Sequence, residues 1–472
     1  MFPLFPRPAR ALGLGLLMTA LGLLAPCQAA EPGLITFVVL GPGGARIARA
    51  ITPATSCPLI RIDGQDQPMT VRAPAGTVPQ RPTRSDPALS KPSVFDTLVC
   101  EANVPLQAQS ASIAGRALPL PPADIRRIVV IGDTGCRIKS ADNAYQACND
   151  PKAYPFAQVA AAAARWAPDL VIHVGDYLYR ENPCPAGQVG CTGSVWGYGG
   201  DAWRADFFGP AAPLLQKAAW AAARGNHESC ARAGQGWWRF IDSRPLAAGR
   251  DCNDAANDDA GDYSDPYAVP LGEGAQLILF DSSDTPANAL TPDQPGWAHY
   301  RDTYAKIAAL SAQADHNILV DHHPMLAFAA GKDKAGAFKL SPGNEGLQSA
   351  FGSLNPTLFP PKVDLLLSGH VHVWEALSFA SPYPAQIVTG FSGTQEDIVP
   401  LPATLPPGAT PAPGVIVKAM SSWVDGFGFM TLERQGPDRW LAQIHDGDGA
   451  VVNTCAIIGS SLSCAIAQVA RP

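Results

Sequence analysis

The chain has 472 residues and a formal net charge of −7, and 47% of its residues are hydrophobic and 16% charged. This length allows roughly two to three domains with a large buried core. The negative charge disfavours attraction to nucleic-acid backbones, so we expect no nucleic-acid partner. The 44 Gly and 46 Pro residues indicate many loops. The prolines separate apolar runs and form no single low-complexity tract, which argues against wholesale disorder.

The N-terminus has the pattern of a secretory signal peptide. Two arginines precede an uncharged apolar stretch over residues 11–24, and small residues follow at Ala29 and Ala30. A membrane anchor is the alternative, but this stretch is shorter than the roughly 20 residues that span a bilayer. We therefore predict that residues 1–29 are a signal peptide. The mature chain is then exported, to the periplasm or outside the cell, and has no membrane attachment.

Ten cysteines follow the predicted signal peptide, and an exported chain meets oxidising conditions. The sequence does not fix their connectivity. As a hypothesis, each cysteine pairs with its neighbour along the chain: Cys57–Cys100, Cys136–Cys148, Cys184–Cys191, Cys230–Cys252 and Cys455–Cys464. A cysteine metal site is disfavoured because no CxxC motif occurs.

Residues 31–122 show short β-type runs broken by Gly and Pro, without a helical period. Residues 35–40 and 94–99 are examples of such runs. The pattern predicts a small all-β module. A Pro-containing stretch at residues 118–124 is predicted to link it to the rest of the chain.

From residue 126 onward, apolar runs of strand length alternate with Ala-rich or amphipathic segments. The expected strands are residues 128–131, 170–174, 276–280, 317–320 and 363–367, and the expected helical segments are residues 156–166, 236–241 and 297–312. Further strands without helices are expected at residues 386–389, 415–419, 427–432 and 440–444. The alternation is typical of βαβ units with strands buried on both faces.

Five short polar motifs follow strand-like segments. They are residues 132–135 (GDTG), 175–179 (GDYLY), 225–228 (GNHE), 321–324 (DHHP) and 369–372 (GHVH). Each motif alone is weak evidence, since a Gly-Asp pair after a strand is usually a turn or a helix cap. Five in series would leave buried polar groups unpaired unless cations bind them. Open α/β sheets place their sites at such strand ends.

In this order the motifs resemble those of the calcineurin-like metallophosphoesterases and, more narrowly, the purple acid phosphatase branch. Most of that superfamily begins with Asp-x-His, but here Gly135 stands at the histidine position. Tyr179 in the second motif matches the tyrosine ligand of the purple branch. The resemblance implies an α/β fold, a four-layer sandwich of two mixed β-sheets flanked by helices, over residues 126–472.

By this resemblance, seven side chains hold two metal ions. The first ion is held by Asp133, Asp176, Tyr179 and His372. The second ion is held by Asp176, which bridges the two, and by Asn226, His322 and His370. A phenolate is a hard, anionic donor, so the first ion is expected to be Fe(III) and the second a divalent ion such as Zn, Fe or Mn.

Four further residues are assigned around the substrate. His227 matches the family's histidine that faces the phosphate without binding metal, and it is the predicted catalytic residue. His323 fills the variable position of the H-x-P motif and is assigned to the substrate or to the layer behind the ligands. Arg180 and Arg224 flank the ligand motifs and are candidates for gripping phosphate. Arginines in such places more often pair with carboxylates.

One position departs from the purple acid phosphatase pattern. That branch often has a second substrate-facing histidine about ten residues after the H-x-P ligand, whereas this chain has Gly331, Lys332 and Lys334 there. Because of this departure, the sequence does not settle which residue protonates the leaving group. It also points to a changed substrate preference.

The predicted function is hydrolysis of small phosphate monoesters, with a metal-bound hydroxide as the nucleophile. A phosphodiesterase or nucleotide hydrolase using the same site is the alternative within the enzyme class. A non-catalytic exported binding protein with a vestigial metal site is the alternative from another class. The oligomeric state stays open.

Overall fold

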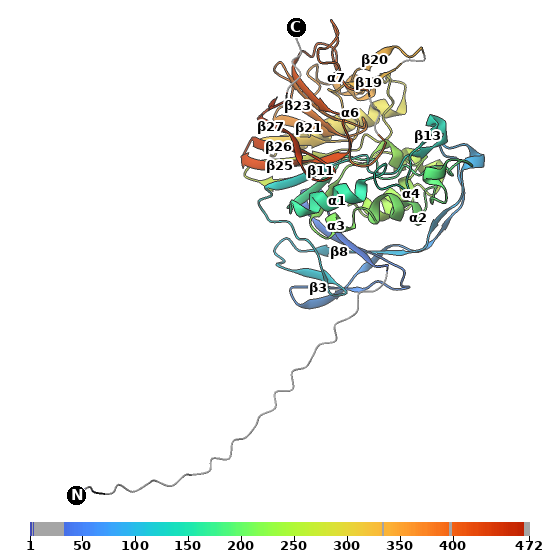
Figure 1. Cartoon of the computed structure of the whole chain (residues 1–472), viewed down its shortest axis with the longest axis vertical. Coiled ribbons are helices and arrows are strands. Elements are labelled where there is room, and N and C mark those ends of the chain that lie inside the picture. Colours follow the sequence, from blue (N-terminus) through green and yellow to red (C-terminus); the bar gives the residue numbers. More distant parts are fainter. Residues whose placement is uncertain (2, 4–32, 333–334, 396–398, 467–472) are drawn as a thin grey trace.

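The computed structural model describes residues 1, 3, 33–332, 335–395 and 399–466. Two mixed β-sheets pack face to face, and the helices lie on their outer sides (Figure 1). The predicted four-layer α/β architecture is therefore confirmed. Apart from residues 1 and 3, the predicted signal peptide at residues 1–29 lies outside the described residues. Among the residues that are described, no helix is long and apolar enough to cross a bilayer.

The larger sheet has eleven strands in the order β28-β27-β26-β25-β11-β14-β15-β1-β2-β8-β5. Its centre is parallel and consists of β11 (Arg127–Ile131), β14 (Leu170–His173), β15 (Ala219–Ala222) and β1 (Ile35–Leu40). On one side follow β2 (Arg46–Thr52), β8 (Leu98–Val104) and β5 (Thr70–Ala73), all antiparallel. On the other side follow β25 (Gly428–Gly436), β26 (Arg439–Asp446), β27 (Val451–Ile458) and β28 (Ser461–Cys464), also antiparallel.

The second sheet has seven strands in the order β16-β17-β18-β21-β23-β22-β24. Its parallel centre is formed by β17 (Ala275–Leu279), β18 (His316–Val320), β21 (Val363–Ser368) and β23 (Ala385–Thr389). The edges are antiparallel: β16 (Tyr267–Gly272), β22 (Trp374–Phe379) and β24 (Val417–Trp423).

The apolar core has three layers, because the central strands are buried on both faces. One cluster joins the inner faces of the two sheets and includes Val130, Ile172, Leu277 and Leu367. The outer face of the larger sheet is covered by α1 (Phe156–Arg165), α2 (Gly200–Trp203), α3 (Ala212–Leu215) and α4 (Gly234–Gly236). The outer face of the second sheet is covered by α6 (Pro295–Ser311) and α7 (Glu345–Gly352). A short helix, α5 (Asp258–Gly261), lies between α4 and β16 in the chain.

The N-terminal region is strand-rich, as predicted, but its strands do not form one sheet of their own. β1, β2, β5 and β8 extend the larger sheet, and Val39 pairs with Trp220 of β15. The strands β3 (Leu59–Ile62), β4 (Gln65–Pro68), β9 (Ala111–Ile113) and β10 (Arg116–Ala117) form a separate four-stranded sheet. The division into domains at residues 31–122 and 126–472 stays a prediction.

Three two-stranded hairpins complete the fold: β6 (Gly76–Val78) with β7 (Ser93–Phe95), β12 (Ile138–Lys139) with β13 (Ala144–Tyr145), and β19 (Ala329–Lys332) with β20 (Phe338–Ser341). The run expected at residues 94–99 is divided between β7 and the start of β8. The segment at residues 236–241 contains a π-helical turn, Trp237–Ile241, after α4.

All five hypothesised disulfides are present. They join Cys57 to Cys100, Cys136 to Cys148, Cys184 to Cys191, Cys230 to Cys252 and Cys455 to Cys464. The pairing by chain neighbours is therefore confirmed. Five disulfides suit an oxidising compartment.

Candidate metal centre

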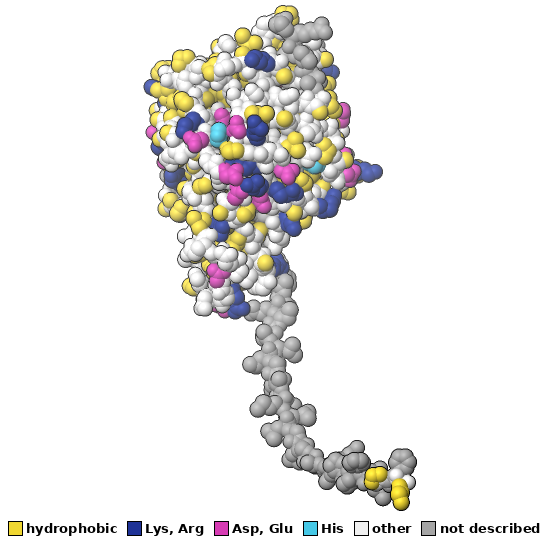
Figure 2. All heavy atoms as spheres, turned by 90° about the vertical axis from the view of Figure 1, so that its left-hand side faces the viewer, with side chains coloured by type: hydrophobic (Ala, Val, Ile, Leu, Met, Phe, Trp, Pro, Cys, Tyr) yellow, Lys and Arg dark blue, Asp and Glu magenta, His cyan; other side chains and the backbone are white. Residues whose placement is uncertain are grey.

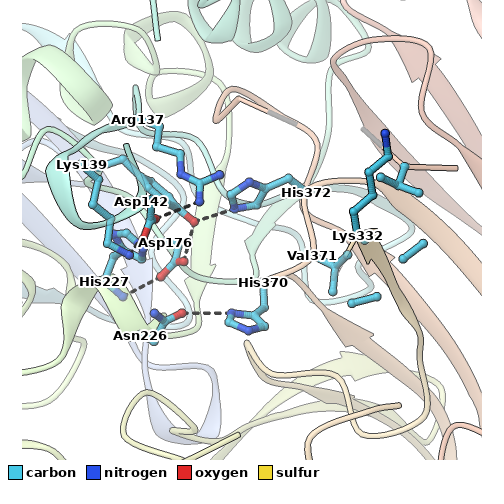
Figure 3. A pocket seen from close by; sticks show the side chains of 15 residues that line it. Arg137, Lys139, Asp142, Asp176, Asn226, His227, Lys332, His370, Val371 and His372 are labelled. Carbon is cyan, nitrogen blue, oxygen red and sulfur yellow. Dashed lines mark hydrogen bonds and ion pairs between the residues drawn. The ribbon is translucent and has the colours of Figure 1, made fainter. Parts of the chain in front are cut away.

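The five polar motifs follow five strands that end at the same edge of the two packed sheets. The larger sheet supplies the motifs after β11, β14 and β15, and the second sheet supplies those after β18 and β21. Figure 3 shows Asp176, Asn226, His370 and His372 turned toward one another. The predicted convergence of distant motifs is therefore observed.

The backbone bends sharply at three of the predicted ligands. Asp133, Asp176 and His370 have φ angles of 54°, 62° and 71°, in the left-handed region that few residues other than glycine adopt. Such conformations persist only where surrounding contacts hold them, and they gather at functional sites. Here each of these turns places a predicted ligand at the strand ends where the five motifs meet.

Two motif glycines allow these turns to pack closely. A Cβ atom on Gly225 would lie 2.1 Å from Oδ1 of Asp176, and one on Gly175 would lie 2.5 Å from Nδ1 of His322. Gly175 also has a φ of 105°. A side chain at either position would therefore push a predicted ligand out of place.

The phenol oxygen of Tyr179 lies at the centre of a first group of donor atoms. It is 2.7 Å from Oδ2 of Asp176, 3.0 Å from Oδ1 of Asp133 and 2.9 Å from Nε2 of His372. Nδ1 of His372 lies 2.9 Å from the carbonyl oxygen of Gln395, so Nδ1 carries the hydrogen and Nε2 offers a lone pair. One phenolic hydrogen cannot serve three acceptors. This set of donor atoms fits a cation.

A second group of donor atoms lies around Asn226. Its Oδ1 is 3.0 Å from Nε2 of His322 and 3.1 Å from Nδ1 of His370. Nε2 of His322 is also 3.1 Å from Oδ2 of Asp176. Because Nδ1 of His322 donates to the carbonyl oxygen of Val174 at 2.9 Å, the neutral ring turns a lone pair toward two oxygens. That arrangement needs a proton or a metal ion, and its N and O donors suit Zn, Fe or Mn.

The pKa shifts of these side chains also indicate that the two donor groups require positive charge. Burial raises the pKa of Asp133, and burial together with Asp176 raises the pKa of Tyr179 well above its usual value. Burial opposes protonation of His322, but the carboxylate of Asp176 outweighs it and raises the pKa of His322 to about 10. A bound metal ion would supply the positive charge that these groups otherwise obtain by retaining protons.

A buried glutamate, which the sequence reasoning missed, supports the Asp176 turn. The carboxylate of Glu228 accepts hydrogen bonds from the backbone N–H groups of Asp176, Tyr177, Leu178 and Gly225, at 2.9–3.2 Å. It thereby ties the second motif to the third. Glu228 stands next to His227 in the GNHE motif. This position was the one feature of the sequence that could have indicated a role for Glu228 at the site.

His227 lies beside the first donor group with its ring 3.7 Å from that of Tyr179. Its Nδ1 is 2.7 Å from Oε1 of Glu181, and Oε2 of the same carboxylate lies 3.7 Å from Nε of Arg232. Burial and the charge of Arg232 lower the pKa of His227 to about 4. The contact with Glu181 fixes the ring orientation. Glu181 and Arg232 were missed because neither belongs to one of the five motifs.

The two arginines assigned to phosphate binding lie elsewhere. Arg180 is buried and pairs with the carboxylate of Asp206. Arg224 is also buried and pairs with Asp262 at 3.2 Å and Asp281 at 3.3 Å. Neither lines the cavity over the donor atoms. Both guanidinium groups are therefore paired with interior carboxylates, and their role in phosphate binding stays a prediction.

His323 is buried behind the exposed ring of His370, 4.3 Å away between ring centres. Its Nδ1 lies 3.3 Å from the hydroxyl of Ser282. The ring nitrogens of His322, His323 and His370 lie within 4.8 Å of one another. This position suits the layer behind the ligands better than contact with substrate, which stays a prediction.

A cavity of about 610 Å³ opens over the donor atoms. Its wall includes Asp176, Tyr179, Asn226, His227, His370 and His372. Three cationic side chains also line it, Arg137, Lys139 and Lys332, together with Asp142. Of these, only Lys332 was noted in the sequence, as a departure from the purple acid phosphatase pattern.

Comparisons with known proteins agree with this geometry. Residues 126–374, more than half of the chain, match the family described as calcineurin-like phosphoesterase. No curated protein matches the chain. Among solved structures, the chain is similar to the purple acid phosphatase PPD1 from yellow lupin (Lupinus luteus) seeds, with a TM-score of 0.53 and 16% identity over 90% of this chain and 74% of that one. It is also similar to PhoD, with a TM-score of 0.50 and 11% identity over 92% of this chain and 91% of that one. At these identities the similarity shows a shared fold.

Proposed function

This chain belongs to the calcineurin-like phosphoesterase family, and on that premise we propose that it is an exported hydrolase of small phosphate monoesters that uses two metal ions. The observation that carries the proposal is the meeting of seven donor side chains from five motifs. These are Asp133, Asp176, Tyr179, Asn226, His322, His370 and His372.

The two ions would neutralise the phosphate oxygens and lower the pKa of a water molecule for attack on phosphorus. Asp133, Tyr179 and His372 would hold Fe(III), because a phenolate favours a trivalent ion. Asn226, His322 and His370 would hold a divalent ion, and Asp176 lies in contact with both groups. The carbonyl oxygens of Val174 and Gln395 would keep His322 and His372, two of the three proposed histidine ligands, in the required tautomer.

His227 would assist departure of the leaving group. It lines the cavity, and its Nδ1 faces Glu181 at 2.7 Å. Its pKa of about 4 keeps the free ring neutral near pH 7, but an incoming phosphate dianion favours the protonated ring. A protonated His227 can then give a hydrogen to the leaving oxygen.

Metal analysis with a visible spectrum tests the proposal. The purified chain is expected to hold two ions, at least one of them iron, and to absorb in the visible region through Tyr179. Tyr179→Phe should lose this absorption. Tyr177→Phe is the matched control, because the hydroxyl of Tyr177 donates to the carbonyl oxygen of Ala223 at 3.1 Å and lies in none of the donor groups. A chain that binds no metal would contradict the proposal.

Turnover of phenyl phosphate and of diphenyl phosphate separates the remaining alternatives. We expect a higher kcat/KM for phenyl phosphate. Preference for the diester would favour a phosphodiesterase, the second candidate. A metal-loaded chain that hydrolyses neither ester would favour a non-catalytic binding protein.

A further inference from the structure

A second cavity lies beside the one over the donor atoms, and the proposed chemistry does not use it. Its volume is about 420 Å³, and its walls include the β19–β20 hairpin, the loop before that hairpin and the segment that leads into α7. We propose that this cavity binds an uncharged, apolar leaving group of the substrate. The inference rests on the proposed function and narrows its substrate class to phosphate monoesters of alcohols that carry a hydrocarbon chain.

The second cavity adjoins the donor groups. Ala329, His370 and Val371 line both cavities. His370 is a proposed ligand of the divalent ion, and it is exposed. Figure 3 shows Val371 next to His370, on the side toward Lys332 of the β19–β20 hairpin. A phosphate ester bound at the donor groups can therefore extend its leaving group past Val371 into the second cavity.

The strand β19 carries small side chains where it passes the first cavity. It begins with Ala329, Ala330 and Gly331, and all three line that cavity. A Cβ atom added to Gly331 would lie in open space, with no described atom within 4 Å beyond its chain neighbours. Gly331 stands where the purple acid phosphatase pattern often has a histidine. The missing side chain therefore leaves room for a leaving group that a histidine would restrict.

The buried side chains that line the second cavity are apolar. They belong to Pro324, Ala327 and Phe328, in the loop before β19. The two charged residues of the wall, Lys339 and Glu345, are exposed and opposite in sign. The wall therefore favours neither anions nor cations. An apolar interior with a few polar groups around it is typical of pockets for organic ligands.

The other polar side chains of this wall do not require a ligand. Oδ1 of Asn344 accepts the backbone N–H of Leu347 at 2.8 Å, and its amide donates to the carbonyl oxygen of Pro286 at 3.1 Å. Asn288 is exposed, and Ser341 pairs with the start of β19 in the hairpin. A ligand in the second cavity thus gains most by burying hydrocarbon against the apolar side chains.

The second cavity also differs from the open surface. On the face shown in Figure 2, hydrophobic side chains are scattered among Lys, Arg, Asp and Glu, and such an arrangement needs no ligand. In the second cavity, Ala287, Phe328 and Leu340 bring three separate segments of the chain to one volume. The two cavities, of about 610 and 420 Å³, each lie within the range of roughly 300–1,000 Å³ for pockets that bind organic ligands.

Alkyl phosphates of increasing length test the inference, because ethanol, butanol and hexanol are nearly equal as leaving groups and differ in apolar area. For the metal-loaded wild type, kcat/KM should rise about two- to fourfold for each added methylene from ethyl to hexyl phosphate. Ala287→Trp changes an exposed residue and fills the second cavity, so the hexyl-to-ethyl ratio should fall at least about tenfold. Ala248→Trp changes an exposed alanine outside both cavities and should keep the wild-type ratio.

Binding gives a second readout. Hexylphosphonate, which is not hydrolysed, should bind the wild type at least about tenfold more tightly than ethylphosphonate, and Ala287→Trp should remove most of this difference. Ala329→Phe places a larger side chain where the two cavities meet and should also lower the hexyl-to-ethyl ratio.

Loss of the ratio in either variant supports the inference. Equal turnover of ethyl and hexyl phosphate by the wild type overturns it, and so does a wild-type ratio in both Ala287→Trp and Ala329→Phe. Hydrolysis of neither ester would instead defeat the proposed function, and the two phosphonates would then still show whether the second cavity binds a hydrocarbon chain.

Discussion

The two sheets contribute different chemistry to the candidate metal centre. The larger sheet supplies the oxygen donors, namely Asp133, Asp176, Tyr179 and Asn226, whereas the second sheet supplies only nitrogen donors, from His322, His370 and His372. Each donor group combines side chains from both sheets. Both donor groups therefore depend on the contact between the two sheets. Metal binding is therefore expected to stabilise the packing of one sheet on the other.

The loops of the two sheets are also held differently. In the larger sheet, Glu228 accepts four backbone hydrogen bonds beneath the Asp176 turn. In the second sheet, the backbone N–H of Phe328 is the one donor to Glu375 of β22 among the described residues, at 3.2 and 3.4 Å from the two carboxylate oxygens. Burial raises the pKa of both glutamates. Glu228, with four hydrogen bonds, thus supports the turn at Asp176. Glu375 lies in the interior of the second sheet with fewer hydrogen bonds among the described residues.

The sharpest test of the shared centre is Asp176→Asn. Oδ2 of Asp176 contacts both Tyr179 and His322, so the variant should loosen both ions. We expect activity to fall by more than about 100-fold, the upper range for loss of an outer partner of a ligand. Metal content and kcat measure the effect. Asp315→Asn, an exposed aspartate paired with Lys362, is the control. Full turnover with two bound ions would show that the sheets do not share a bridging ligand.

The ligands could be predicted from the sequence because each stands in a short motif directly after a strand. The strand that precedes a motif cannot always be recognised in the sequence, however. β15 reads Ala-Trp-Ala-Ala, which has no clear strand pattern, and only its place between β14 and β1 makes it a strand. The β12–β13 hairpin was missed for a similar reason, since its strands have two residues each and depend on the Cys136–Cys148 disulfide.

The contacts of charged side chains far apart in the chain could not be predicted. Arg180 looked available because it follows a ligand motif, but Asp206 comes from a segment 26 residues later. The N-terminal strands likewise looked like a separate module, because local patterning cannot show that β1 pairs with β15 nearly 180 residues away. Motif chemistry is local, whereas pairing partners depend on the complete fold.

A smaller effect is expected from Glu228→Gln, which tests the support in the larger sheet. The amide offers one acceptor oxygen in place of two, so some of the four backbone N–H groups lose their partner. Metal affinity should fall by about 10- to 100-fold while the ligands themselves remain. Titration with a competing chelator measures this. Glu273→Gln removes an exposed ion pair with Arg126 and should leave the affinity unchanged. If Glu228→Gln binds metal as tightly as the wild type, then Glu228 does not support the site.

The last expected effect lies in the second sheet and concerns stability alone, with no change in metal binding. Burial raises the pKa of Glu375 from 4.5 to about 8. Between these pH values the folded chain keeps the proton and the unfolded chain releases it, so rising pH favours unfolding. Glu375→Gln removes this dependence. The free energy of unfolding of the wild type should therefore fall by about 3 kcal/mol more than that of the variant between pH 5 and pH 8.

Denaturant unfolding at several pH values measures this difference. Glu433→Gln changes a half-exposed side chain on β25 and should follow the wild-type curve. Metal binding should be unaffected in both variants, because Glu375 contacts the loop at Phe328 and lies in neither donor group. If Glu375→Gln and the wild type lose stability in parallel as pH rises, then Glu375 is ionised in the folded chain. The contrast between Glu228 and Glu375 would then rest on the number of backbone hydrogen bonds that each accepts among the described residues.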